Sequence, residues 1–215
     1  MNYLAHLHLA EVAGENDEGR LGNLVADMVK GPEVELLPAG VQAGIRMHRG
    51  IDRFTDAHPL VQRSIGRISA EWGWFSGIVI DVFYDHILAA NWLEWSDEPL
   101  PAFVERTHAM LLRGTHHLNA DGQFLVSKLI ETNRLLMYAA PDGIADTLAR
   151  LSDRIAIRLP QRARRLEEAM PLLEACRSGL EADFRGFYPA VVEHAVSFRG
   201  SRRESVPDSC AKACR

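Results

Sequence analysis

Residues 77–92, GIVIDVFYDHILAANW, are hydrophobic on nearly every side of the predicted helix, yet they carry Asp81, Asp85 and His86 in their middle. A helix that is apolar all round is expected to be buried. Buried carboxylates need partners, because an unpaired ionised group costs several kcal/mol of folding free energy. The chain must therefore bury this helix and supply polar partners for its acids from other segments.

Helix start and stop signals recur along the chain. Asn16 and Asp17 precede one periodic segment, which Gly31 and Pro32 end. Another segment fills residues 39–57 and stops before a His-Pro pair, since the residue before proline disfavours helix. Further helical segments are predicted at about residues 60–71, 75–95, 100–113, 121–139, 142–158, 161–177 and 180–198.

This pattern predicts the fold class. Alternating Val-, Ile- and Thr-rich runs, which are typical of strands, are almost missing, and residues 3–10, YLAHLHLA, are too short to decide by alternation. We predict an all-α protein, a compact multi-helix bundle with a single domain over residues 1–198. The polar, small-residue composition of residues 199–215 predicts a disordered tail.

Composition argues against several functional classes. The formal net charge of the 215 residues is −5, which disfavours general nucleic-acid binding. The apolar runs are too short to span a membrane, and the N-terminus lacks the basic segment of a secretory signal. Cys176, Cys210 and Cys214 have no zinc-finger spacing, so we predict reduced thiols in a cytoplasmic protein.

Three polar pairs are spaced four residues apart, so each pair shares one face of a helix. The pairs are Asn23 with Asp27, His48 with Asp52, and Asp81 with Asp85, and Asp56 extends the second. If the helices converge, these groups can surround a divalent cation, which removes the cost of burying unpaired acids. Aspartate oxygens with one or two imidazoles suit Mn²⁺, Mg²⁺ or Fe²⁺ better than a closed structural zinc site.

Each pair also has a structural interpretation. The first pair could lie on a solvated face, and the second could be a local charge-assisted hydrogen bond. The third could pair with Arg46, Arg49 or Arg53. His86 lies about 100° around the helix from Asp85, so both face one ion only if the helix end is irregular.

Other histidines and other chemistries give weaker signals. The roles of His6 and His8 stay open, although a hydrogen-bonded core position is favoured for at least one of them. The serines have no suggestive His–Asp spacing, and the glycines form no phosphate-binding loop. Metal-assisted hydrolysis is the chemistry that remains.

Four stretches resemble the successive motifs of bacterial acyl carrier protein phosphodiesterases: MNYLAHLHLA, LGNLVADMVKG, GIRMHRGIDRFTDAHP and IVIDVFYDHILAANW. The resemblance implies hydrolysis of the phosphodiester between 4′-phosphopantetheine and a serine of holo-acyl carrier protein, within fatty acid and lipid metabolism. Apo-acyl carrier protein and 4′-phosphopantetheine would be the products. The resemblance further implies dependence on Mn²⁺ and a distant relationship to the all-helical HD-type metal phosphohydrolases.

Carried over by position, the resemblance also implies the catalytic residues Asp27, His48, Asp52, Asp81, Asp85 and His86, all except the last as metal ligands. The chain has no His-Asp dipeptide, which is the hallmark of the HD group. It has Asp85-His86 in the reverse order. Individual ligand roles therefore do not transfer directly from that group.

A phosphodiester is anionic, so its site needs positive charge beyond one metal. Arg46, Arg49 and Arg53 lie on the helix of His48 and are placed to hold phosphate oxygens. Salt bridges with acids such as Asp56 are the structural alternative. The aromatic residues Trp72, Trp74 and Phe75 could wall a groove for the pantetheine arm or belong to the core.

A run of five arginines has no acid within it: Arg154, Arg158, Arg162, Arg164 and Arg165. Acyl carrier proteins are small and strongly acidic, so we predict that this surface receives the protein substrate, with Arg158, Arg162 and Arg165 as contacts. A solvated basic face is the alternative.

Two other functions compete with this interpretation. An HD-like phosphohydrolase of a nucleotide or another small phosphoester would use the same metal site. A non-catalytic helical interaction protein would use the acid and histidine pairs as buried salt bridges and would carry no stoichiometric metal.

Overall fold

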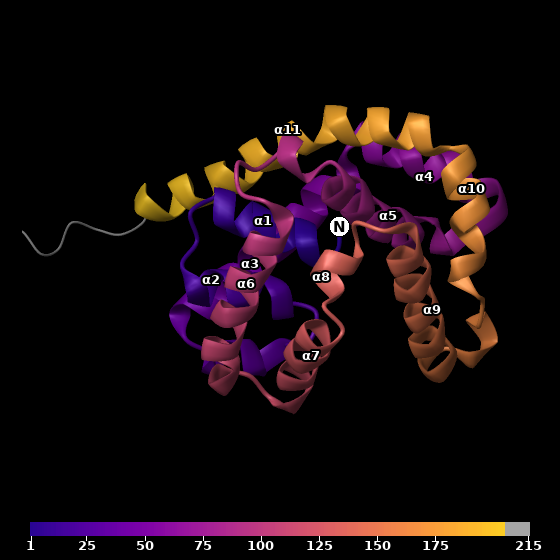
Figure 1. Ribbon diagram of the computed structural model, residues 1–215. Helices are drawn as coiled ribbons and strands as arrows, with labels where there is room; N and C mark the ends of the chain where they lie inside the picture. The colour runs from indigo at the N-terminus through magenta and orange to yellow at the C-terminus, as the bar shows by residue number, and fades with distance from the viewer. Residues whose placement is uncertain (205–215) are drawn as a thin grey trace, which may run out of the picture.

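The computed structural model describes residues 1–204, with side-chain burial up to residue 198 (Figure 1). Throughout that range the regular elements are helices and no strand occurs, which confirms the predicted all-α class. The α-helices are α1 (Tyr3–Val12), α2 (Asp17–Val25), α3 (Ala39–Ala57), α4 (Pro59–Trp72), α5 (Ser76–Ala90), α6 (Leu100–Gly114), α7 (Ala120–Glu131), α8 (Arg134–Met137), α9 (Pro141–Arg158), α10 (Met170–Ala175) and α11 (Arg177–Glu204). An HD-like relationship stays a prediction.

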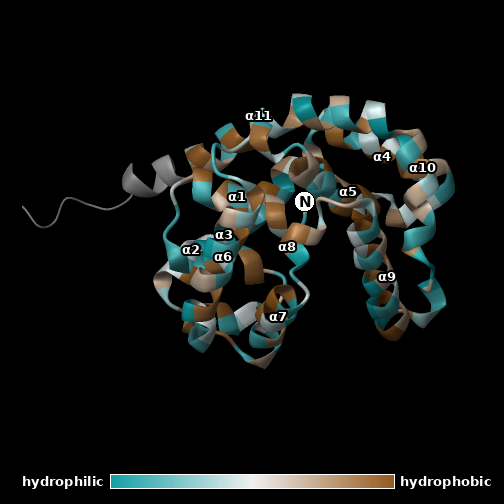
Figure 2. Ribbon diagram, in the orientation of Figure 1, coloured by the Kyte–Doolittle hydropathy of each residue, from teal (hydrophilic) through white to brown (hydrophobic). Residues whose placement is uncertain are grey.

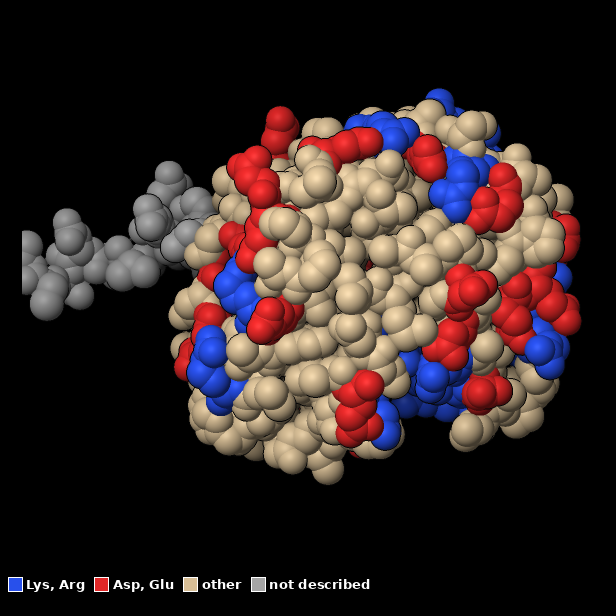
Figure 3. All heavy atoms as spheres, in the orientation of Figure 1, with Lys and Arg blue, Asp and Glu red and all other residues tan. Residues whose placement is uncertain are grey.

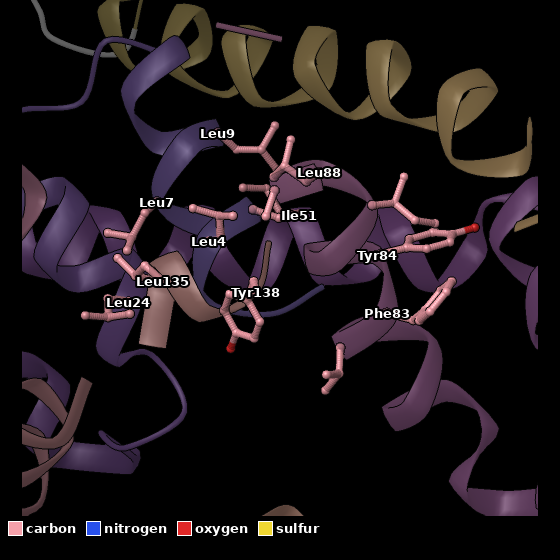
Figure 4. Close-up of a cluster of buried hydrophobic side chains, with 14 of the residues drawn as sticks. Leu4, Leu7, Leu9, Leu24, Ile51, Phe83, Tyr84, Leu88, Leu135 and Tyr138 are labelled. Atoms are coloured by element: carbon pink, nitrogen blue, oxygen red, sulfur yellow. The ribbon is translucent and has the colours of Figure 1, made fainter. Parts of the chain in front are cut away.

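The segment YLAHLHLA is helical, and α1 lies at the centre of the molecule. Every residue from Leu4 to Ala10 is buried, because other helices surround α1 on all sides. Leu4 and Leu9 lie close to Ile51 of α3 and Leu88 of α5 in the core (Figure 4). The alternation of apolar residues therefore reflects burial on all sides of a helix rather than the two faces of a strand.

The quoted helix, α5, is buried as predicted, with a continuous run of buried residues from Val82 to Ala89. Hydrophobic residues accordingly gather on α1 and α5 inside the molecule, while the outer helices are mixed (Figure 2). One cluster of buried residues extends from Leu4 to Ala195. No helix of the described chain is sufficiently long and apolar to cross a membrane.

The long helix α11 covers α1, α3, α4 and α5 along one side of the molecule (Figure 1). Asp183 of α11 is completely buried and accepts hydrogen bonds from Arg63, Ser64 and Arg67 of α4. A buried carboxylate with this many donors is stable, so this network fixes α11 to α4.

Several predicted helices end or break at different residues. The segment predicted at 121–139 divides into α7 and α8 at Asn133, whose left-handed backbone (φ 45°) ends one helix before the next begins. The segment predicted at 161–177 consists of short pieces, η5 (Pro160–Arg162), η6 (Leu166–Ala169) and α10. Pro160 and Pro171, in the first turns of η5 and α10, disfavour one continuous helix.

The C-terminal boundary also differs. Helix α11 continues beyond residue 198, the expected end of the domain, to Glu204. The rest of the predicted tail, with Cys210 and Cys214, lies outside the described residues. Cys176 is a partly buried free thiol.

Candidate metal centre

Two glycines bring the backbones of α2 and α3 into direct contact. A Cβ atom on Gly22 would collide with the carbonyl of Val41, and one on Gly44 would collide with the carbonyl of Gly19. Only glycine permits this approach. As a result Asn23, the residue after Gly22, reaches the side chains of α1 and α3.

The polar cluster forms where α1, α2 and α3 meet. Asp52 Oδ1 lies 3.1 Å from His6 Nε2, and Asp52 Oδ2 lies 3.0 Å from His48 Nε2. The two imidazole rings stack with their centroids 3.9 Å apart. Asp27 Oδ1 lies 3.6 Å from His48 Nε2 and borders the cluster from the turn that follows α2. One ligand atom each from His6, His48 and Asp52 lies within 4.8 Å of the others.

Asn23 orients both imidazoles. His48 Nδ1 donates to the Asn23 backbone carbonyl at 2.8 Å, and His6 Nδ1 donates to the Asn23 side-chain oxygen at 3.0 Å. With the proton on Nδ1, the lone pair of each neutral ring is on Nε2. Both Nε2 atoms are buried and make no well-aligned hydrogen bond within the described residues, although Asp52 is close. Such a second partner on Nδ1 is typical of metal-binding histidines.

Burial and charge set the protonation of the cluster. Burial lowers the pKa of His6 to about 4. Burial would also lower the pKa of His48, but Asp27 and Asp52 outweigh it and raise this pKa to about 9. Burial alone would raise the pKa of Asp52, yet the two imidazoles hold it well below its usual range. The imidazole of His48 also holds the pKa of Asp27 below its usual value.

At neutral pH the cluster therefore has two carboxylates, one imidazolium and one neutral imidazole, a net charge of −1. The donor set of two imidazole nitrogens and one or two carboxylates fits a divalent transition metal. Asp27 is the exposed member, with 78% of its side chain accessible, so the cluster opens to solvent on that side.

The structure corrects the positions of the predicted α5 ligands. Asp85 is completely buried, and its oxygens accept hydrogen bonds from the backbone amides of Asn2 (3.2 Å), Leu4 (2.7 Å) and Ala5 (3.3 Å). These amides lie at the start of α1, where a carboxylate is favoured by the unpaired N–H groups and the helix dipole. Asp85 therefore caps α1 instead of facing the cluster. Burial raises the pKa of Asp85 to about 7.

Asp81 and His86 are not among the converging ligand atoms of His6, His48 and Asp52. Asp81 Oδ1 lies 3.1 Å from the buried Met1 amine; burial would lower the pKa of this amine, but Asp81 and Asp52 outweigh it and raise this pKa. His86 Nδ1 donates to the carbonyl of Tyr138 at 2.7 Å, and its Nε2 accepts from Arg177 at 2.9 Å. Both ring nitrogens of His86 thus have partners, the carbonyl of Tyr138 directly after α8 and the guanidinium of Arg177 on α11.

His6 is the cluster residue whose role the sequence left open. We expected a hydrogen-bonded core position for at least one of His6 and His8. His8 has that position, because it is buried and its Nδ1 lies 2.8 Å from the Tyr188 hydroxyl. Residues two apart point to nearly opposite sides of a helix, so only one of the two histidines can face α3. The i,i+4 search missed His6 because it has no acidic partner at that spacing.

The predicted phosphate-binding arginines are exposed on α3. Arg46, Arg49 and Arg53 make no ion pair or hydrogen bond within the described residues, so the alternative of salt bridges to Asp56 or to the α5 acids is not found. These guanidinium groups are exposed and available to bind an anion.

The arginine run divides into two parts at Pro160. Arg154 and Arg158 line a hollow between α7 and α9. The three arginines after Pro160 contact aromatic or acidic side chains instead. Arg162 lies over the ring of Trp74 and Arg164 over that of Trp72. Arg165 forms ion pairs with Glu167 and Glu168. One continuous landing surface is therefore not formed. Trp72 and Phe75 belong to the core, while Trp74 is 57% exposed.

The fold and the cluster define an all-helical protein with a His–His–Asp site suited to a divalent cation. Residues 1–191 match the sequence model of the family described as acyl carrier protein phosphodiesterase, and the chain belongs to this family.

Curated relatives agree with that assignment. A protein named acyl carrier protein phosphodiesterase from Yersinia enterocolitica is 38% identical over 197 residues, covering 91% of this chain and 97% of the relative. A protein of the same name from Photorhabdus laumondii is 35% identical over 196 residues, covering 91% and 95%. No solved structure matches.

Proposed function

We propose that this protein is a metal-dependent phosphodiesterase that releases 4′-phosphopantetheine from the serine of holo-acyl carrier protein. Family membership supports the reaction and the protein substrate. The observation that carries the metal dependence is the convergence on Asp52 of two buried Nε2 atoms, neither of which makes a well-aligned hydrogen bond within the described residues.

His6, His48 and Asp52 would hold the cation, with Asp27 as a further oxygen donor. Two imidazole nitrogens favour Mn²⁺ or Fe²⁺ over Mg²⁺, which takes oxygen ligands almost exclusively. When bound, the metal supplies a Lewis acid for the phosphoryl oxygens and lowers the pKa of a coordinated water.

The protein residues perform the remaining tasks. Asn23 holds both imidazoles in the tautomer that presents Nε2. Asp27 is ionised and exposed, so its carboxylate is placed to accept a hydrogen bond from the attacking water. Arg46, Arg49 and Arg53, exposed on the same helix as His48 and Asp52, would offer guanidinium groups to the non-bridging oxygens, which adds the positive charge that an anionic diester requires.

Mass spectrometry of holo-acyl carrier protein tests the proposal. Incubation with the protein and Mn²⁺ should remove the phosphopantetheine mass and leave the apo form, and addition of a chelator should stop the reaction. Hydrolysis that is indifferent to the chelator would contradict the metal site. Hydrolysis of nucleotides, with an unchanged carrier protein, would favour the small-phosphoester alternative.

A further inference from the structure

A hollow of about 480 Å³ lies between α7 and α9 and has basic residues at its edge (Figure 3). Five basic side chains line it: Lys128, Arg134, Arg150, Arg154 and Arg158. Only two acids, Asp121 and Asp153, line it as well, so its local charge is about +3 (five minus two) on a chain of net charge −5. This local excess of positive charge comes from three consecutive helices, α7, α8 and α9.

Three of these cations have no partner among the described residues. Arg134, Arg154 and Arg158 make no ion pair or hydrogen bond within the part of the chain that the structure describes. In contrast, Lys128 and Arg150 pair with acids of their own helix. Unpaired guanidinium groups that line one hollow are typical of a surface that binds an anionic partner.

Apolar side chains line the same hollow. They are Met28, Phe124 and Leu125, and Phe124 is 64% exposed. A hollow lined by apolar and cationic side chains complements an amphipathic helix that has acidic residues beside its apolar face. A small phosphoester would need the charge without the exposed apolar area.

The hollow adjoins the metal centre. Met28 in its wall directly follows Asp27, and Tyr3 in its wall belongs to α1, the helix of His6. A helix bound between α7 and α9 would therefore have one end close to the cluster. This position suits a protein substrate whose scissile group must reach the cluster while the rest of it stays outside.

We propose that the hollow between α7 and α9 is the docking groove for an acidic amphipathic helix of the carrier protein, an inference that rests on the proposed function. Arg134, Arg154 and Arg158 bind its acids, and Phe124 contacts its apolar face. The groove replaces the continuous arginine surface expected from the sequence and adds Arg134, from another helix, to it.

Charge reversal tests the groove. The variants are Arg154→Glu with Arg158→Glu, and separately Arg134→Glu; Arg113→Glu is a control, because Arg113 is an exposed arginine on α6 that pairs with Asp17. The groove variants should raise the KM for holo-acyl carrier protein by about tenfold or more, whereas the control should not. The effect should shrink at high salt, which screens exposed charges.

Two further measurements separate the possible failures. Binding of apo-acyl carrier protein by fluorescence anisotropy needs no catalysis, so it tests the groove even if the proposed reaction is absent. Rates on bis(p-nitrophenyl) phosphate should fall less than rates on the carrier protein. Equal losses on both substrates, or unchanged binding of the carrier protein by both groove variants, would overturn the proposal while leaving the phosphodiesterase function intact.

Discussion

The polar pairs of α3 and α5 have the same spacing and opposite roles. His48 and Asp52 on α3 face a second imidazole, that of His6, whose Nε2 makes no well-aligned hydrogen bond within the described residues. Asp85 on α5 faces three backbone amides, which satisfy its oxygens. Spacing brings two side chains to one helix face, but the groups opposite that face decide whether a carboxylate can bind a ligand or caps a helix.

The two regions are linked through α1. Asp85 caps the start of this helix, and His6 projects from its middle into the cluster. The structural acid of α5 thus helps to hold α1, and with it one imidazole, in place against α3. Variants of the two pairs should accordingly fail in different ways.

The largest effect is expected for Asp52→Ala. Removal of a carboxylate between both imidazoles should reduce hydrolysis by more than the roughly 10- to 100-fold that loss of an outer-shell partner costs. Helicity should stay close to that of the wild type, because the Asp52 carboxylate pairs with side chains and accepts no backbone hydrogen bond within the described residues. Turnover of holo-acyl carrier protein, bound metal and far-UV circular dichroism measure the three properties. Retained metal and turnover would show that the α3 pair is structural.

For Asp85→Ala we expect a loss of stability instead. Three amides at the start of α1 would lose their acceptor, and each buried unsatisfied donor costs about 1–3 kcal/mol. The free energy of unfolding in urea should fall by about 3 kcal/mol or more, with a smaller loss for Asp85→Asn, which keeps one acceptor oxygen. A loss of activity without a loss of stability would show that Asp85 acts as a metal ligand rather than as a cap of α1.

Metal affinity should depend on pH through one proton. In the metal-free protein the raised pKa of His48, about 9, means that this imidazole is protonated at neutral pH, whereas His6 is neutral above about pH 4. A ligand must lose its proton to bind metal, so the Kd for Mn²⁺ should fall about tenfold per pH unit as the pH rises toward 9. Calorimetry in buffers of different ionisation enthalpy would count the released proton; an affinity independent of pH would exclude His48 as a ligand.

The smallest effect on turnover is expected for Asp81→Ala. Asp81 is 38% exposed, but the Met1 amine with which it pairs is buried, so the substitution leaves that amine unpaired and costs stability rather than a metal ligand. Turnover should fall far less than in Asp52→Ala. A loss as large as that of Asp52→Ala would show that Asp81 reaches the metal, as the sequence motif implied, and would remove the contrast between α3 and α5.

The sequence by itself determined the helical class, because apolar periodicity and stop signals such as His58-Pro59 act within a few residues of the chain. The burial of α5 was predictable for the same reason, from its composition alone. The pair His48 and Asp52 was also accessible, since both residues lie on one helix and their relative position is set by local geometry. The boundary at Asn133 was not, because a left-handed backbone at asparagine has no strong local signal.

Only the tertiary structure decided the membership of the cluster. His6 belongs to the cluster because the glycine contact between α2 and α3 places Asn23 within hydrogen-bonding distance of both imidazoles. Asp85 does not belong to it, because its carboxylate binds the backbone amides at the start of α1. The arginine run divided likewise, since Arg154 faces α7 whereas Arg162 lies on Trp74. These outcomes depend on contacts between residues far apart in the chain, which helical spacing within one segment does not encode.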